Sequence, residues 1–237
     1  MTEFTTWRSL VDGAEISAIP DSVVKDSQWY YDPRSEDAND NDTLTQLTDQ
    51  GDEGNNATVL DGETGADYVE SGINGFPSYS WDDDGMEVSF SNLTEFYFIA
   101  VLRWDGPGDE RNVFMRNDKI SSSMITARRN DQWSSNAHDT GANDLIESTS
   151  GEEIIFEMFR ESSENFEFRL HPLDDFTFDA DPREVDKVLF GRHGSLDRHY
   201  EGLSGEMALI SPVPSASERQ DIREYISNEW DIDLLSD

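Results

Sequence analysis

The sequence predicts an all-β sandwich that ends in a single α-helix. Short apolar segments recur from residue 76 onward and are separated by Gly, Pro, Asn, Asp and Ser, which is the pattern of strands joined by turns. The chain contains 13 Phe, 7 Tyr and 6 Trp, enough bulky side chains to fill one core although the apolar fraction is only 35%. Its length of 237 residues fits one large all-β domain or two small ones.

The first third of the chain carries few strand signals. Residues 1–26 hold scattered apolar positions interrupted by Pro20, so we expect an N-terminal arm or an irregular lead-in. Residues 29–31, Trp-Tyr-Tyr, are expected to form a short aromatic strand. Residues 32–72 are rich in Asp, Asn, Gly, Thr and Glu, which predicts a long loop. The apolar residues expected to anchor this loop are Leu44, Leu47, Ala57, Val59 and Leu60.

From residue 76 onward the pattern is that of strands. Residues 78–81 and 86–90 alternate between apolar and polar side chains, as half-buried strands do. Residues 96–104 form an almost continuous apolar run followed by a turn, which predicts a central strand. Further strands are expected at residues 113–115, 124–127, 154–159, 166–170, 185–191 and 202–211. The segments 154–159 and 166–170 should pair as a hairpin.

The last predicted element is a helix at residues 216–230. Ser215 is a good N-cap, and Glu218 follows three residues later, as in a capping box. Apolar side chains recur on one helical face at Ile222, Ile226 and Trp230. We therefore expect this helix to pack on or beside the sandwich. Glu206, in the preceding strand, is interpreted as a sheet-edge residue, so this stretch is scaffold and binding is expected in the acidic loops.

The order of these segments carries a resemblance to a known family. The segments are Trp-Tyr-Tyr-Asp at 29–32, Gly-Ile-Asn-Gly-Phe-Pro-Ser-Tyr-Ser-Trp-Asp at 72–82, Phe-Tyr-Phe-Ile-Ala-Val-Leu-Arg at 96–103, and Tyr-Glu-Gly-Leu-Ser-Gly-Glu-Met-Ala-Leu-Ile at 200–210. Together with the final helix they resemble the concanavalin A-like lectin/glucanase (laminin G-like) jelly-roll superfamily, in the form found in tail and surface proteins of phages.

The resemblance covers residues 27–234 and implies a jelly-roll of two antiparallel sheets with one short C-terminal helix. We accordingly expect an N-terminal arm at 1–26 and one laminin G-like domain at 27–237. The shared motifs are specific to the fold rather than to a chemistry, so the resemblance supports architecture more than activity.

Charge is the strongest compositional signal. Asp and Glu number 52 against 17 Lys and Arg, which gives a net charge of −35. Such a chain repels itself at low salt and remains soluble when concentrated salt screens its charges, which predicts a high-salt cytoplasm or brine. An acidic protein of ordinary salinity is the alternative. Nucleic acids and anionic membranes are poor partners for either, because binding them requires basic residues. With no cysteine, disulfides and thiolate metal sites are excluded.

Targeting signals are not evident at the start of the chain. Residues 1–7, Met-Thr-Glu-Phe-Thr-Thr-Trp, contain neither a basic segment nor an apolar one, and no apolar run approaches about 20 residues. We expect a protein made in the cytoplasm without export and without membrane insertion. Assembly into a virus particle followed by lysis would still bring it outside the cell.

Catalytic patterns are incomplete. A glycosidase of the superfamily that this chain resembles needs acidic residues on both sides of the scissile bond. The nearest candidate pair is Glu184 and Asp186. The third acid of the family pattern is missing, because Val188 occupies its position. We therefore expect no enzymatic activity. His193 and His199 lie with Arg192 and Arg198 in a locally basic segment. Its arginines are expected to pair with neighbouring carboxylates, and a ligand site is the alternative.

Calcium is the one metal that the resemblance implies, because related jelly-rolls hold it with loop carboxylates and carbonyls. The candidate ligands fall in two loops: Asp49, Asp52 and Asn55 in the first, and Asp82, Asp83 and Asp84 in the second. Neither loop has the EF-hand spacing. Solvated acidic loops that bind no metal are the alternative.

Sugar binding would use exposed aromatic residues flanked by Asp and Asn. Trp133, between Asp131 and Asn136, is the best candidate. Its indole either contacts a ligand or an interface, or is buried, and the sequence leaves both alternatives open. Trp104 beside an aspartate is the second, and we favour packing for it. Trp81 and Trp230 are expected in the core.

The function predicted from these observations is that of a non-enzymatic structural or attachment protein of a haloarchaeal virus, such as a capsid turret, decoration or tail component. We expect a homo-oligomer that binds other virion proteins, with host surface glycans as a further partner. A cellular carbohydrate-binding module or glycosidase of a halophile is one alternative, and an architectural domain without a ligand is another.

Overall fold

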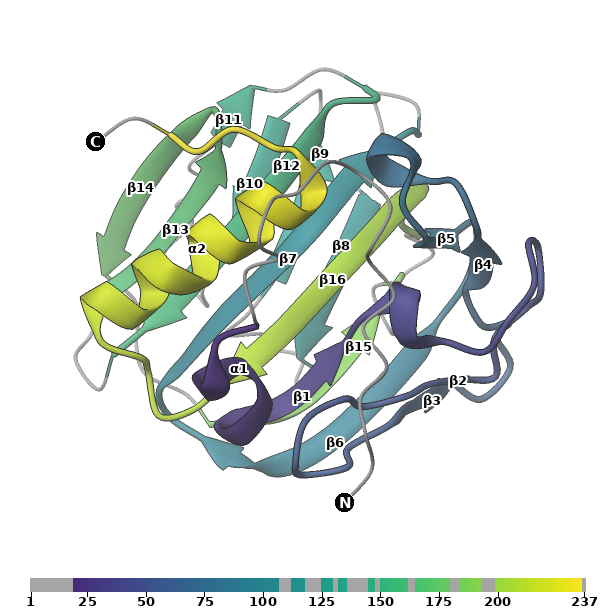
Figure 1. Cartoon of the computed structure of the whole chain (residues 1–237), viewed down its shortest axis with the longest axis horizontal. Helices are drawn as coiled ribbons and strands as arrows, with labels where there is room; N and C mark the ends of the chain where they lie inside the picture. Colours follow the sequence, from purple (N-terminus) through teal and green to yellow (C-terminus); the bar gives the residue numbers. More distant parts are fainter. Residues whose placement is uncertain are drawn as a thin grey trace, which may run out of the picture.

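The computed structural model describes residues 19–106, 112–117, 125–129, 132–135, 145–147, 150–161, 165–179, 184–192 and 199–235. Within these residues two antiparallel sheets lie face to face, and one long helix crosses the outer face of the first sheet (Figure 1). The all-β sandwich with a C-terminal helix that the sequence predicts is therefore confirmed.

Sheet A has the strand order β14-β13-β12-β7-β16-β5-β4, and β1 pairs with β16 beside this path. Its strands are β1 (Ser27–Tyr31), β4 (Asp67–Val69), β5 (Ser78–Trp81), β7 (Phe96–Trp104), β12 (Glu153–Arg160), β13 (Asn165–His171), β14 (Asp174–Asp179) and β16 (Gly202–Ile210). The predicted hairpin is present as β12 and β13, and β7 lies at the centre of the sheet as the sequence predicts.

Sheet B has the order β11-β10-β9-β8-β15-β6-β3-β2. Its strands are β2 (Gln46–Leu47), β3 (Ala57–Val59), β6 (Met86–Leu93), β8 (Asn112–Asn117), β9 (Ile125–Arg129), β10 (Gln132–Ser135), β11 (Leu145–Glu147) and β15 (Val185–Phe190). The long loop predicted for residues 32–72 is corrected here, because short strands β2, β3 and β4 interrupt it.

The main core lies between the sheets and is rich in aromatic rings. Trp29 stacks on Tyr31 with ring centroids 5.1 Å apart, and the Phe190 ring stands nearly perpendicular to Trp29 with centroids 5.2 Å apart. Trp81 and Trp104 are each 1% exposed in this same core. Aromatic pairs with these geometries add to the free energy gained by burial alone, so β1 and β15 are fixed across the sandwich.

A second core lies between sheet A and the helix α2 (Ala216–Trp230) (Figure 1). The capping box is confirmed, since Ser215 accepts from the backbone N–H of Glu218, and the Glu218 carboxylate accepts from that of Ser215. Gly205 lies under Trp230, where an added Cβ would stand 2.5 Å from the indole ring. The helix therefore approaches β16 closely at its C-terminal end.

Three short helical elements complete the described residues: α1 (Asp21–Lys25), η1 (Pro33–Ser35) and η2 (Ile73–Gly75). The α1 helix falls in the segment expected to be a packed arm, and its Val23 belongs to the core under α2. No helix in the described ranges is long and apolar enough to cross a membrane.

Candidate functional site

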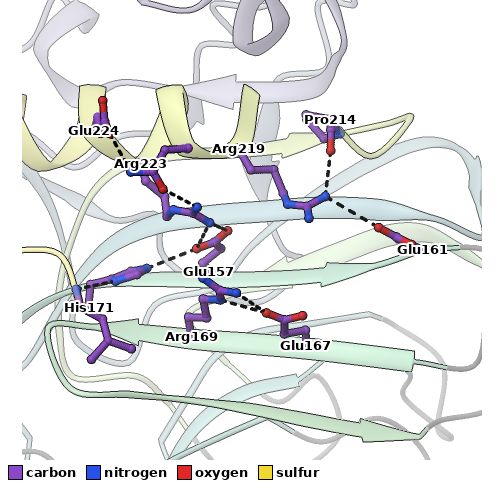
Figure 2. Close-up of polar contacts among 11 residues, drawn as sticks. Glu157, Glu161, Glu167, Arg169, His171, Pro214, Arg219, Arg223 and Glu224 are labelled. Atoms are coloured by element: carbon purple, nitrogen blue, oxygen red, sulfur yellow. Dashed lines mark hydrogen bonds and ion pairs between the residues drawn. The ribbon is translucent and has the colours of Figure 1, made fainter. Parts of the chain in front are cut away.

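A fully buried carboxylate connects two strands of sheet A to helix α2. Glu157, on β12, is 0% exposed and accepts from Nη1 of Arg223 on α2 at 2.9 Å (Figure 2). The Nε2 atom of His171, at the end of β13, lies 3.3 Å from the other carboxylate oxygen. Nη2 of Arg223 in turn donates to the side-chain oxygen of Gln220 at 2.6 Å.

Both ring nitrogens of His171 are occupied. The backbone N–H of Leu235, in the segment after α2, donates to Nδ1 at 2.9 Å, so Nδ1 carries the lone pair and the proton is on Nε2, facing Glu157. The residue is 2% exposed. In this conformation neither ring nitrogen is free to take a proton from a substrate.

The pKa of Glu157 follows from the same contacts. Burial alone would raise it, but the hydrogen bond from His171 and the positive charge of Arg223 lower it below its ordinary value. The group is therefore ionised at neutral pH and forms a buried ion pair with the helix. This arrangement fixes α2 on the sheet.

A second buried glutamate lies under the other end of α2. Glu206, on β16, is 1% exposed and accepts from the hydroxyl of Tyr30 at 2.8 Å, from Nε1 of Trp230 at 3.0 Å and from Arg34. The interpretation of Glu206 as a sheet-edge residue is wrong. The strand β16 is internal, with β7 on one side and β5 and β1 on the other, and α2 covers its outer face.

Arg34 serves three carboxylates. Besides Glu206, it donates through Nε to Asp32 at 2.7 Å and through Nη1 to Glu229 at 2.9 Å, and these four residues are called the Arg34 cluster. Its guanidinium also lies 5.3 Å from the ring centroid of Trp230. Burial raises the pKa of Glu206, although the charge of Arg34 opposes this.

These buried ion pairs are not predicted from the sequence. The available signal was a single charged residue inside an apolar strand, Glu157 in Ile-Ile-Phe-Glu-Met-Phe and Glu206 in Gly-Glu-Met-Ala-Leu-Ile. A charge in such a place needs a partner of opposite sign. The partners Arg34 and Arg223 are distant in sequence, so only the fold reveals them.

A different polar group reaches the surface at one corner of the sandwich. The Asp83 corner consists of Glu63, Asp83, Arg192 and His199, which come from the β3–β4 connection, the β5–β6 turn and the two ends of the β15–β16 connection. Arg192 forms an ion pair with Glu63, and Nδ1 of His199 lies 2.7 Å from Oδ1 of Asp83. The Asp83 side chain is 76% exposed. Within the described residues, this corner brings a predicted calcium ligand, Asp83, next to the predicted basic segment, and it does so beside solvent.

Asp84 anchors the turn that carries this corner. Its carboxylate accepts from the hydroxyl of Thr64 at 2.5 Å and from the backbone N–H of Asp82 at 2.9 Å, and the residue is 6% exposed. Burial raises its pKa. The backbone N–H of Gly85 also donates to the carbonyl of Thr64. The β5–β6 turn is therefore tied to the β3–β4 connection, and the exposed Asp83 stands on a fixed base.

Gly191 allows the two connections to meet at the corner, and its replacement should be costly. It has φ +77°, and an added Cβ would lie 2.5 Å from the carbonyl oxygen of Asp84 and 2.7 Å from the ring of Trp81. We expect Gly191→Ala to lower the free energy of unfolding by roughly 2–4 kcal/mol, from backbone strain and overpacking together. Urea denaturation at constant salt measures this.

Gly54→Ala is the matched control, because Gly54 has φ +71° and nothing within 4 Å of an added Cβ. Strain alone should then cost about 1 kcal/mol. Equal losses for the two variants would show that the close approach at Gly191 contributes nothing.

The aromatic residues considered for sugar binding lie in the core. Trp133, in β10, is 1% exposed, and its ring centroid is 6.3 Å from that of Tyr200, so of the two alternatives left open for this residue the structure shows burial. The β-strand, which a short polar sequence did not reveal, turns this indole inward. Trp104 is buried, which confirms the packing interpretation. Asp131 and Asn136 lie outside the described residues.

The loop acids considered for calcium serve the loops themselves. Asp49 accepts from the backbone N–H groups of Tyr30, Gly51 and Asn55, while Asp52 is exposed. In the other loop Asp83 faces His199 and Asp84 is held by Thr64. No group of three or more His, Asp or Glu side chains in the described part of the chain is placed to hold a metal ion. Calcium binding at these loops, which would also use carbonyl and amide oxygens, stays a prediction.

In the described part of the locally basic segment, the side chains pair with carboxylates, as the sequence predicts for its arginines. Arg192 and His199 both face carboxylates, and they pair with each other through an isolated β-bridge. His193 and Arg198 lie outside the described residues.

The jelly-roll sandwich of two antiparallel sheets with one C-terminal helix is shared with solved structures of other proteins. The chain is similar to the binding domain of botulinum neurotoxin serotype D, with a TM-score of 0.60 and 11% identity over 84% of this chain and 51% of that chain. It is similar to the serotype D ligand binding domain in complex with N-acetylneuraminic acid, with a TM-score of 0.61 and 9% identity over 84% of this chain and 50% of that chain.

A third similar structure is the Trypanosoma rangeli sialidase in complex with 2,3-difluorosialic acid, with a TM-score of 0.61 and 11% identity over 91% of this chain and 36% of that chain. The chain thus spans about half the length of the toxin domains and less of the sialidase. No protein-family model and no curated protein sequence matches the chain. At these identities the likeness establishes the fold, and the expected jelly-roll architecture is confirmed to that extent.

Proposed function

We propose that this chain is a non-enzymatic glycan-binding module that attaches a virus particle to a halophilic host. The observation that carries the proposal is the likeness of most of the chain to receptor-binding domains, one of them in complex with N-acetylneuraminic acid. The net charge of −35 supports a high-salt setting. The closed environment of His171, with both ring nitrogens engaged, supports a role other than catalysis.

The Asp83 corner is the proposed contact region for the glycan. Sugar hydroxyls donate readily to carboxylates, and Asp83 is a mostly exposed carboxylate on an anchored turn. His199 and Arg192 add nitrogen groups beside it. Because the chain is strongly acidic, neutral sugars with adjacent hydroxyls suit this corner better than anionic sugars do.

A glycan array probed at molar salt tests the proposal. We expect neutral glycans to bind, and Asp83→Asn to weaken that binding roughly tenfold, because a hydrogen bond to a charged group is lost. Glu87→Gln is the matched control, since Glu87 is a partly exposed carboxylate paired with Lys187 on the outer face of sheet B. Binding that is absent from every glycan, or equal losses for the two variants, would contradict the proposed contact region.

The place in the particle is tested separately. Mass spectrometry of purified virions should detect the chain in a fixed ratio to the major capsid protein, and light scattering should show a homo-oligomer. Detection only in the cytosol of uninfected cells would contradict the virion role while leaving glycan binding open to the array.

A further inference from the structure

The one Asn-Gly dipeptide in the sequence lies where helix α2 ends. Asn74 and Gly75 belong to the η2 turn between β4 and β5, and both are exposed. Nδ2 of Asn74 donates to the carbonyl oxygen of Trp230 at 2.8 Å and to that of Asp231 at 3.3 Å. The last carbonyl groups of a helix have no partner within the helix, so this carboxamide caps the C-terminal end of α2.

We propose that Asn74 is a site of spontaneous deamidation and that the modified residue releases the C-terminal end of α2. In the first step hydroxide removes the proton from the backbone nitrogen of Gly75, and this nitrogen bonds to Cγ of Asn74. The Cγ–Nδ2 bond breaks, ammonia leaves with a proton from water, and a succinimide ring remains. Water then adds to one of the two ring carbonyl groups and opens the ring, which leaves aspartate or isoaspartate at this position.

Glycine at position 75 and the exposure of the turn favour this reaction, while the docked helix restrains it. Ring closure requires the nitrogen of Gly75 to swing toward Cβ of Asn74, but at the observed ψ of 28° it lies on the opposite side. The same nitrogen donates to the carbonyl of Gly72 at 3.4 Å. The two hydrogen bonds to the end of α2 also hold the carboxamide in place. The reaction therefore proceeds when η2 and the end of α2 separate.

Deamidation then makes this separation permanent. The carboxamide nitrogen is a donor, whereas the carboxylate that replaces it can only accept. It would face the carbonyl oxygens of Trp230 and Asp231 at the negative end of the helix dipole. Neither carbonyl would find its present donor, so the last turn of α2 loses a fixed attachment to η2.

The experiment follows deamidation in the folded chain at mildly alkaline pH and molar salt. Peptide mass spectrometry compares Asn74 with Asn41, an internal control that is also exposed and has a positive φ of 65° but precedes Asp42 instead of glycine. We expect Asn74 to deamidate several-fold faster than Asn41, with isoaspartate as the main product. Chains modified at Asn74 should show faster amide hydrogen exchange over residues 227–232.

Two variants complete the test. Arg34→Met loosens the Trp230 end of the helix and should accelerate deamidation at Asn74 but not at Asn41. Asn74→Gln keeps a carboxamide and should remain unmodified at that position. Equal rates at Asn74 and Asn41 in the unsubstituted chain, or unchanged hydrogen exchange in the modified chain, would overturn the proposal. Both of those measurements stand even where Arg34→Met fails to fold.

Discussion

Replacing Arg34 with methionine should lower the free energy of unfolding by roughly 3–5 kcal/mol, because the substitution leaves buried carboxylates without their cation. Arg34 is the cation bonded to Glu206, whose side chain is 2% exposed, and to Asp32 and Glu229, which are 12% and 10% exposed. Methionine retains much of the apolar contact with Trp230. Denaturant unfolding at fixed molar salt measures the loss, since buried pairs are screened far less than exposed ones.

Arg103→Met is the control for Arg34→Met. Arg103 also pairs with two carboxylates, Asp105 and Glu153, but these are 41% and 29% exposed. Its loss should cost no more than about 1 kcal/mol. Adding Glu206→Gln to Arg34→Met should recover part of the stability, because the buried charge is removed together with its partner. Equal losses for the two arginine variants would mean that the Arg34 cluster is an ordinary surface network.

The sequence predicts best those elements whose apolar and capping residues match their burial and their ends in the structure. Residues 96–104 are apolar on both faces, and both faces of β7 are buried, one against sheet B and one under α2. The final helix is likewise specified by its capping box and its apolar stripe. Strands β10 and β11 are short and their sequences, Gln-Trp-Ser-Ser and Leu-Ile-Glu, carry too little pattern to be distinguished from loop.

The candidate sites were harder to predict, because acidic residues are frequent throughout the chain. In a chain with 52 acidic residues, the presence of Asp or Glu carries little information about binding. The prediction placed function in acidic loops, but the acids of these loops differ: Asp49 closes its own loop, whereas Asp83 is mostly exposed. The distinctive acids, Glu157 and Glu206, lie in apolar strands. Their significance depends on arginines brought to them by folding.

Arg223→Met should destabilise the protein by roughly 3 kcal/mol at neutral pH, because Glu157 would remain buried without the arginine that is bonded to it. This loss of free energy of unfolding should depend on pH. In the unsubstituted chain the pKa of Glu157 is lowered below its ordinary value of 4.5, so the stability it contributes is present above that value and is lost as pH falls through the folded-state pKa.

Without Arg223 the desolvation of Glu157 is opposed only by His171 and more distant charges, and its pKa rises. Between the raised and the lowered pKa, the folded variant binds a proton that the folded parent does not bind. Lowering the pH through this window therefore stabilises the variant relative to the parent, and the difference between their free energies of unfolding becomes smaller. Urea unfolding at a series of pH values on both sides of 4.5 measures this change.

Arg219→Met separates the charge effect from general damage to the helix. Arg219 lies one turn before Arg223 on α2, packs over the Phe159 ring at 4.2 Å and faces Glu161, which is 60% exposed (Figure 2). Its loss should cost about 1 kcal/mol and should not vary across the same pH range, since no buried carboxylate loses its partner. If the two variants have parallel pH profiles, Glu157 is not the group that fastens the helix, and the attachment of α2 rests on its apolar face alone.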